Sequence, residues 1–263
     1  MKYTPSDIFY TIGGVAILAS TLIIWQIVSI TNTLPPTVFP PASVVLVSLY
    51  QLLTAKSIYV QLIASLIRLF EGFFLAALIG IGVGVPMGLN RTAEKTGDPL
   101  VQFLRPMPSA VLIPLAIFYF GLGNAMIVSI VTYACIWPIL INTIDGIKSI
   151  DTIILDTSTG FQVKGFSKIR KVIIPAASPF IFSGLRVSLG VAWIVEITAE
   201  MLSTAATTGI GAAIFSYFNI PSLPPVYATI IFVALLAYAL NRLFLIFQSK
   251  IIPWHEQSKR RTS

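Results

Sequence analysis

Apolar residues fill this chain in long runs, and short segments between them hold most of the prolines and charges. Each run reaches the roughly 20 residues that an α-helix needs to cross the hydrocarbon core of a bilayer. The pattern therefore predicts an all-α membrane protein with six transmembrane helices, at 9–30, 62–87, 99–120, 125–147, 178–202 and 227–247.

Composition supports this fold class and excludes a soluble globule. Hydrophobic residues make up 56% of the 263 positions and charged residues 10%, with a mean hydropathy of +0.89. We expect a single transmembrane domain over 1–263, with an anchor helix at 9–30 and a five-helix core over about 62–247. The first run is longer than a signal-peptide core and has only Lys2 as a charged head, so we interpret it as a retained anchor.

The cations are distributed unevenly between the two sides that six spans would define. With the N-terminus inside, twelve of the 17 Lys and Arg residues fall in inner segments and only Lys56 in an outer one. This asymmetry predicts cytoplasmic N- and C-termini. The net charge of +7 therefore indicates topology, and we expect the lipid bilayer, not nucleic acid, as the surrounding partner.

Residues for metal or covalent chemistry are scarce. His255 is the only histidine and Cys135 the only cysteine, so a His-based catalytic or metal site and an intrachain disulfide are excluded. We interpret Cys135 as a small core residue. No Gly-rich phosphate loop ending in Gly-Lys-Ser or Gly-Lys-Thr occurs, so the chain is not itself an ATPase.

The longest polar and basic segment lies between the fourth and fifth runs, at about 151–175. Its apolar residues recur at helical spacing among four cations, which predicts short amphipathic helices at a membrane surface: Phe161, Phe166, Ile169, Val172 and Ile173. The inner position of this segment indicates a cytoplasmic partner.

Several spans carry features that suggest a pathway through the membrane. Arg105-Pro106-Met107-Pro108 and Pro114 break the third span, which predicts either a pathway wall or a surface helix followed by a kinked span. Trp137-Pro138 kinks the fourth. In the fifth, Glu196 and Glu200 share a helical face. Glu196 either is protonated, is paired with an Arg such as Arg105 or Arg186, or lies off the pathway. Glu200 could instead cap or pair structurally. The candidate pathway residues are thus Arg105, Pro108, Trp137, Arg186, Glu196 and Glu200.

Glycine and proline predict the remaining local structure. Gly80, Gly84 and Gly88 are four apart on one helical face, which favours close helix packing over a substrate role. The four prolines of 34–41 exclude a helix there, whereas the residues after Pro41 predict a short one along the outer surface. A further outer re-entrant or surface helix is expected within 207–219.

The chain resembles the permease subunit of bacterial binding-protein-dependent ABC importers. The cytoplasmic signature of that family is Glu-Ala-Ala, three residues, Gly, nine residues and Ile-x-Leu-Pro. With Val172-Ile173-Ile174-Pro175 on its end, Asp156-Thr157-Ser158 falls on Glu-Ala-Ala and Gln162 on the glycine, so Gly160 or Gly165 would have to supply the turn. Further segments resemble the nitrate, bicarbonate, sulfonate and taurine branch: 103–108, 120–123, 175–179, 184–186, 192–193 and 199–202.

The resemblance implies a type I ABC importer permease fold in a bacterial cytoplasmic membrane and no cofactor bound by this chain. The partners it implies are a second permease copy, two cytoplasmic subunits that bind ATP and Mg, and an external solute-binding protein. It further implies that the polar segment is a coupling helix that docks on the ATPase, through Asp156, Thr157, Ser158, Gly160, Phe161, Gln162, Gly165, Phe166 and Pro175.

An alternative function is a secondary transporter that is driven by an ion gradient and uses Glu196 as its proton carrier. Six spans without a detectable internal repeat disfavour it. For an importer, the branch suggests a small oxyanion or organic anion as the solute, whereas an ionised Glu196 on the pathway would favour a neutral or cationic one.

Overall fold

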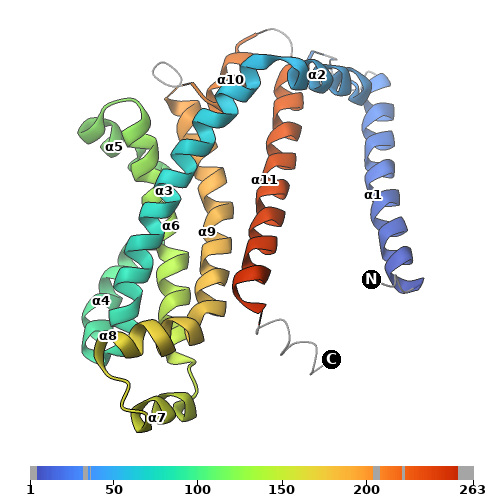
Figure 1. Cartoon of the computed structure of the whole chain (residues 1–263). Helices are drawn as coiled ribbons and strands as arrows, with labels where there is room; N and C mark the ends of the chain where they lie inside the picture. Colours follow the sequence, from blue (N-terminus) through green and yellow to red (C-terminus); the bar gives the residue numbers. More distant parts are fainter. Residues whose placement is uncertain (1–4, 32–34, 36, 204–207, 221–222, 254–263) are drawn as a thin grey trace.

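The computed structural model describes residues 5–31, 35, 37–203, 208–220 and 223–253, and within these ranges the regular elements are all helical. Four helices are long and apolar enough to cross a membrane: α3 (Lys56–Leu89), α6 (Asn124–Lys148), α9 (Ile174–Leu202) and α11 (Pro224–Ile251). They stand side by side in Figure 1. These helices confirm the second, fourth, fifth and sixth predicted runs.

The third predicted run is broken, as its prolines indicate. Helix α4 (Arg91–Leu104) and the pair formed by the 3-10 turn η1 (Ser109–Leu112) and α5 (Ile113–Phe120) meet at an angle of 84°. The break falls on 105–108, where Pro106 and Pro108 lack the N–H groups that would continue the helix. Pro114 lies in the first turn of α5, so the expected second break is absent. Counting the bent pair once, the described helices provide up to five spans.

Glycines set the contact between α3 and α6. A methyl group built on Gly80 would lie 2.9 Å from Cγ2 of Ile139, and one on Gly84 would lie 2.8 Å from Cβ of Thr143. Gly72 and Gly88 meet α6 in the same way, whereas Gly82 faces open space. The predicted glycine face is therefore confirmed as a packing surface inside one subunit.

The contact between α6 and α9 is equally close. Gly146 leaves room for Phe180, and Gly184 for the backbone carbonyl of Pro138. Cys135 is fully buried, and the backbone carbonyl of this residue accepts a hydrogen bond of 2.8 Å from Ser188 Oγ. Cys135 is a core residue, as expected.

Helix α1 (Pro5–Ile30) covers the first predicted run and stands apart from the four long helices, with α2 (Ala42–Thr54) bridging the gap (Figure 1). The short helix predicted after Pro41 is thus present. Gln26 Oε1 accepts a hydrogen bond from the Ser43 N–H at 3.1 Å, and Trp25 Nε1 donates to the Pro40 carbonyl at 3.0 Å. These hydrogen bonds from side chains of α1 therefore fix the orientation of α2 relative to α1.

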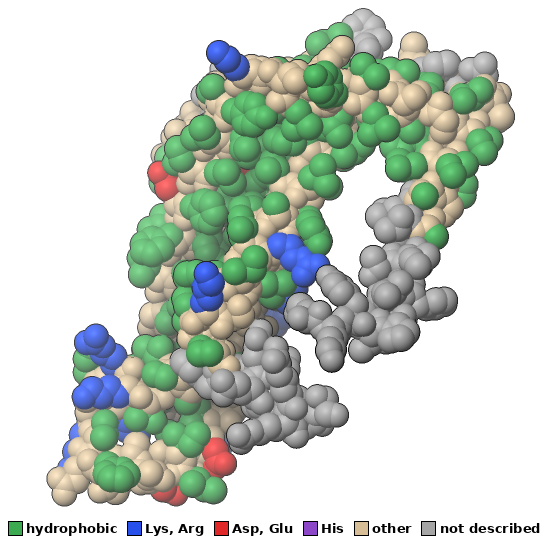
Figure 2. Space-filling view, turned by 45° about the vertical axis from the view of Figure 1, so that its right-hand side comes forward, with side chains coloured by type: hydrophobic (Ala, Val, Ile, Leu, Met, Phe, Trp, Pro, Cys, Tyr) green, Lys and Arg blue, Asp and Glu red, His purple; other side chains and the backbone are tan. Residues whose placement is uncertain are grey.

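The two ends of the molecule differ in character. One end carries the short helices α7 (Thr152–Gly160) and α8 (Gly165–Lys168), and the other carries α2 and α10 (Ile210–Phe218). Lys and Arg side chains gather near the α7 end in Figure 2, with Lys164, Arg170 and Lys171 exposed there. Helix α1 begins and α11 ends toward the α7 side, in the arrangement that two termini on one side of a membrane require.

Candidate functional site

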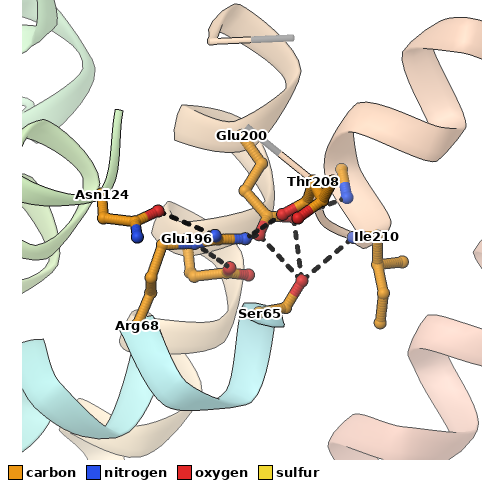
Figure 3. A network of polar contacts seen from close by, with 8 residues as sticks. Ser65, Arg68, Asn124, Glu196, Glu200, Thr208 and Ile210 are labelled. Carbon is orange, nitrogen blue, oxygen red and sulfur yellow. Dashed lines mark hydrogen bonds and ion pairs between the residues drawn. The ribbon is translucent and has the colours of Figure 1, made fainter. Parts of the chain in front are cut away.

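A buried ion cluster connects α3 and α9 near the α10 end of the molecule (Figure 3). Ser65 and Arg68 are contributed by one face of α3, and Glu196 and Glu200 by one face of α9. The side chains of Arg68, Glu196 and Glu200 are at most 4% exposed. Charges at this depth require partners, because an unpaired buried ion is strongly destabilising.

Glu200 is the best satisfied member of the cluster. Its carboxylate is ion-paired with Arg68 and accepts hydrogen bonds of 2.8 Å from Ser65 Oγ and from the Gly211 N–H. The Ile210 N–H donates to Ser65 Oγ at 3.0 Å. Glu200 therefore caps the first turn of α10, where the free N–H groups and the helix dipole favour a negative charge.

Glycines allow this close approach between Glu200 and α10. A methyl group on Gly209 would collide with the Glu200 carboxylate, and one on Gly211 would collide with the Ile197 carbonyl and lie 2.7 Å from Glu200 Cβ. Gly209 is extended, with a φ of 169°, so the requirement for glycine there is spatial. Gly209 and Gly211 fit against Glu200 and the end of α9 only because they lack side chains.

Arg68 connects the remaining elements. It donates to Asn124 Oδ1, at the start of α6, at 3.0 Å and to the Thr208 carbonyl, just before α10, at 2.7 Å. Its Nε lies 3.8 Å from Glu196 Oε1 without a hydrogen bond. Arg68 thus reaches α6, α9 and the residue that precedes α10 from a single position on α3.

A second site is the turn between α7 and α8. Helix α7 ends in a Schellman motif, in which the Val163 N–H donates to the Ser158 carbonyl at 3.0 Å and the Gln162 N–H to the Thr159 carbonyl at 2.9 Å. Gln162 adopts the left-handed conformation with a φ of 55°, and Gly165 does so with a φ of 58°. Of the two glycines expected to replace a glycine at 162, Gly165 supplies part of the turn, whereas Gly160 is the last residue of α7.

The chain then passes without a break into the fifth span. Helix α8, a π-helical turn at Ile169–Ile173 and α9 form one helix of 38 residues, Gly165–Leu202. The second amphipathic helix was predicted as a separate element, so this continuity corrects the sequence interpretation. Pro175 lies in the first turn of α9, two residues after the π-helical turn, and it lacks the backbone N–H that a regular hydrogen-bond ladder would use there.

Residues 72–253 match the model of the binding-protein-dependent transport system inner membrane component family. This chain belongs to that family. The matched region includes α7, α8 and both carboxylates of the ion cluster. The chain is therefore an inner-membrane permease component of an ABC importer.

Curated relatives and solved structures agree with the family. The chain is 32% identical to the bicarbonate transport system permease of Synechococcus elongatus, over 84% of this chain and 82% of that protein. It is 30% identical to the taurine transport system permease of Escherichia coli, over 93% and 89%. The methionine ABC transporter MetNI, solved in an inward-facing conformation, has a TM-score of 0.62 at 18% identity, covering 72% of this chain and 92% of that one. The type I importer fold is thus present.

The structure separates the predicted pathway residues of this permease. Glu196 and Glu200 lie together, but their cation is Arg68. The two predicted partners, Arg105 and Arg186, form no ion pair with them within the described residues.

The other predicted pathway residues lie elsewhere. Arg186 donates from Nε to Asn241 Oδ1 at 3.1 Å. Arg105 lines a cavity of about 560 Å³ between α4 and α6. Pro108 precedes η1, and Trp137 meets Tyr133 edge to face with ring centroids 5.5 Å apart. A pathway role for each stays a prediction.

Arg68 is the site residue that sequence reasoning missed. The sequence predicts Arg105 or Arg186 as the cation for Glu196 and gives Arg68 no role. The available signal was its position: Arg68 is flanked by apolar residues on both sides, about three turns from the start of α3 at Lys56. An arginine at that depth requires a buried carboxylate partner.

Gln162→Gly is expected to stabilise the turn between α7 and α8 by about 1 kcal/mol, because a residue with a Cβ is strained in the left-handed region. The readout is slower hydrogen exchange of the Val163 amide, which the Schellman bond protects. Gly160→Ala, at a helical position with open space around it, is the matched control and should not slow that exchange. Unchanged exchange in Gln162→Gly would show that residue 162 does not limit the turn.

Proposed function

We propose that two copies of this permease form the translocation pathway of an ATP-driven importer for a small oxyanion or organic anion such as nitrate, bicarbonate or a sulfonate. A separate ATPase pair, which holds ATP and Mg, drives it, and an external solute-binding protein delivers the solute. Family membership supports the importer, and the names of the bicarbonate and taurine relatives support the solute class.

The observation that carries the ATPase coupling is the turn between α7 and α8, at the basic end of the molecule. We call it the coupling turn; it is rigid and is flanked by aromatic side chains. Phe161 and Phe166 flank the turn and are 78% and 76% exposed, although burial of such rings is strongly favourable. The Schellman motif fixes the end of α7, and Phe166 lies at the start of the 38-residue helix that continues into α9. A partner that binds both rings would therefore act on the end of a continuous helix, which turns from the direction of α8 into that of α9 (Figure 1).

Replacing Phe161 and Phe166 together by Ala is expected to weaken association with the ATPase about tenfold or more. Aromatic side chains at the centre of an interface contribute most of its binding free energy. ATP-driven uptake by reconstituted liposomes should fall with it. The measurement is the yield of ATPase co-purified with the permease, together with uptake per complex.

The matched control is Phe74→Ala, which removes an exposed aromatic side chain from α3, far from the turn. It should leave ATPase association unchanged. Normal ATPase yield and normal uptake in the Phe161 and Phe166 variant would reject the coupling assignment.

Two surfaces that would be unfavourable or unpartnered against lipid alone support a second copy of the permease. Glu71 is exposed within the apolar helix α3 and has no ion pair among the described residues. A carboxylate on a lipid-facing surface is costly, so we place another protein surface or the aqueous pathway there. Helix α1, which stands apart and is tied to α2, offers a further surface for a partner.

The energy source and the solute are tested in one reconstituted system. Uptake should require ATP and the ATPase, persist when the proton gradient is dissipated, and be inhibited by an excess of the transported anion. Uptake that survives without ATP but collapses with the proton gradient would favour the secondary transporter instead. Binding of bicarbonate, nitrate, taurine and alkyl sulfonates to the purified external binding protein would identify the solute.

A further inference from the structure

Arg68 lies between two carboxylates that are bonded very differently. Glu200 is held by Arg68, Ser65 and the Gly211 N–H, whereas neither carboxylate oxygen of Glu196 has a hydrogen-bond partner among the described residues. Glu196 is nevertheless completely buried. The Nε of Arg68, 3.8 Å away, is also without a hydrogen bond in the described part of the chain.

This arrangement is energetically unfavourable unless Glu196 gains a partner in another conformation of the protein. A buried carboxylate without donors is destabilising, and the second carboxylate of Glu200 nearby adds repulsion. Yet an unbonded guanidinium N–H lies close to Glu196, and the two glutamates are one helical turn, or about 6 Å, apart along α9. A small movement of the guanidinium along α9 would exchange one carboxylate for the other.

We propose that Arg68 is a two-position latch for α10. In the position seen here, Arg68 and Glu200 together hold the first turn of α10. In the second position, α10 leaves α9 and Arg68 pairs with Glu196, so the buried cation keeps a partner while the cap of α10 opens. Glu196 is thus a positioning residue that stabilises the released state.

The location of the latch gives this exchange a role in transport. Glu196 and Glu200 lie near one end of the continuous helix Gly165–Leu202, and the coupling turn with Phe166 lies at the other. A push on the coupling turn therefore reaches the latch through one helix. This role rests on the proposed importer function, and in it α10 opens and closes the side of the permease opposite the ATPase.

The test measures release of α10 directly by cysteine labelling. In a Cys135→Ser background, which removes the only native thiol, Ala213→Cys places a thiol at a position of α10 that is 6% exposed. Its labelling rate by a small maleimide in the intact membrane-embedded chain reports how often α10 opens. The reference reporter is Ser216→Cys, at an exposed position of the same helix.

The two glutamate variants are expected to shift labelling in opposite directions. Glu200→Gln removes the charge that holds α10, so Ala213→Cys should label about fivefold faster. Glu196→Gln relieves repulsion in the docked state and removes the charge that receives Arg68 in the released one, so labelling should become about fivefold slower. Ser216→Cys should label at the same rate in both, and Glu196→Asp should restore much of the native rate.

A purely structural cluster gives a different result. If Glu196→Gln leaves the rate unchanged or raises it, as Glu200→Gln does, the two-position latch is wrong. If Glu200→Gln fails to fold, Glu196→Gln, which breaks no hydrogen bond, decides alone. Labelling shifts of the expected signs in a chain that shows no ATP-driven uptake would reject the importer function and leave the latch intact.

Discussion

Arg68→Met is expected to leave little folded permease, because it strands Glu200 and Glu196 without a cation. Removing one partner of a buried ion pair costs about 3–5 kcal/mol, which is a large share of the roughly 5–15 kcal/mol that stabilises a typical protein. The variant also removes the hydrogen bonds to Asn124 and the Thr208 carbonyl. The measurement is the yield of monodisperse protein after solubilisation and its Tm.

Two comparisons show whether this loss comes from stranded charge. Arg186→Met removes an exposed arginine that donates only to Asn241 among the described residues, and its Tm should stay close to the parent value. Adding Glu200→Met to Arg68→Met should recover part of the Tm, because an apolar pair can replace a buried ion pair. An Arg68→Met protein with the parent Tm would mean that the cluster contributes little to the fold.

Gly84→Leu is expected to separate α3 from α6 and to lower the stability of the permease by about 3 kcal/mol, at the upper end for overpacking a dense interface. A single methyl group there already lies 2.8 Å from Thr143 Cβ, so a leucine side chain has no space without movement of a helix. Because α3 carries Arg68 and α6 carries Asn124, the displacement should also disturb the ion cluster.

Gly82→Leu is the matched control, two residues away on the same helix. A side chain at Gly82 meets no atom within 4 Å, and replacement of a helical glycine there should raise stability by about 0.5–1 kcal/mol. Thermal unfolding in one detergent compares the two variants. Equal effects of the two substitutions would contradict the role of Gly84 as a contact between helices.

The sequence predicted the spans well because hydrophobicity in a membrane is a local property. Each long helix is recognisable from its own residues, and the prolines at 106 and 108 indicated the break before η1. The Schellman turn at Gln162 was less accessible. The family pattern has glycine there, and only the backbone shows that a residue with a Cβ adopts the left-handed conformation.

The ion cluster shows the limit of reasoning along the chain. Glu196 and Glu200 were recognisable because a spacing of four places them on one helical face, but their cation comes from α3, more than 120 positions earlier. Many arginines could have paired with them. The choice of Arg68 depends on how α3, α6 and α9 meet, and this is set by glycine contacts that have no electrostatic signal.

By itself, the sequence determined that this chain is a helical membrane protein with a basic, amphipathic segment between two spans and two carboxylates within one span. These properties follow from local composition and helical periodicity. Only the tertiary structure decided that Arg68 is their partner, that Glu200 caps α10 and that Glu196 has no hydrogen-bond donor among the described residues. The physical reason is that pairing energy depends on distance in space, which the packing of helices fixes and the order of residues does not.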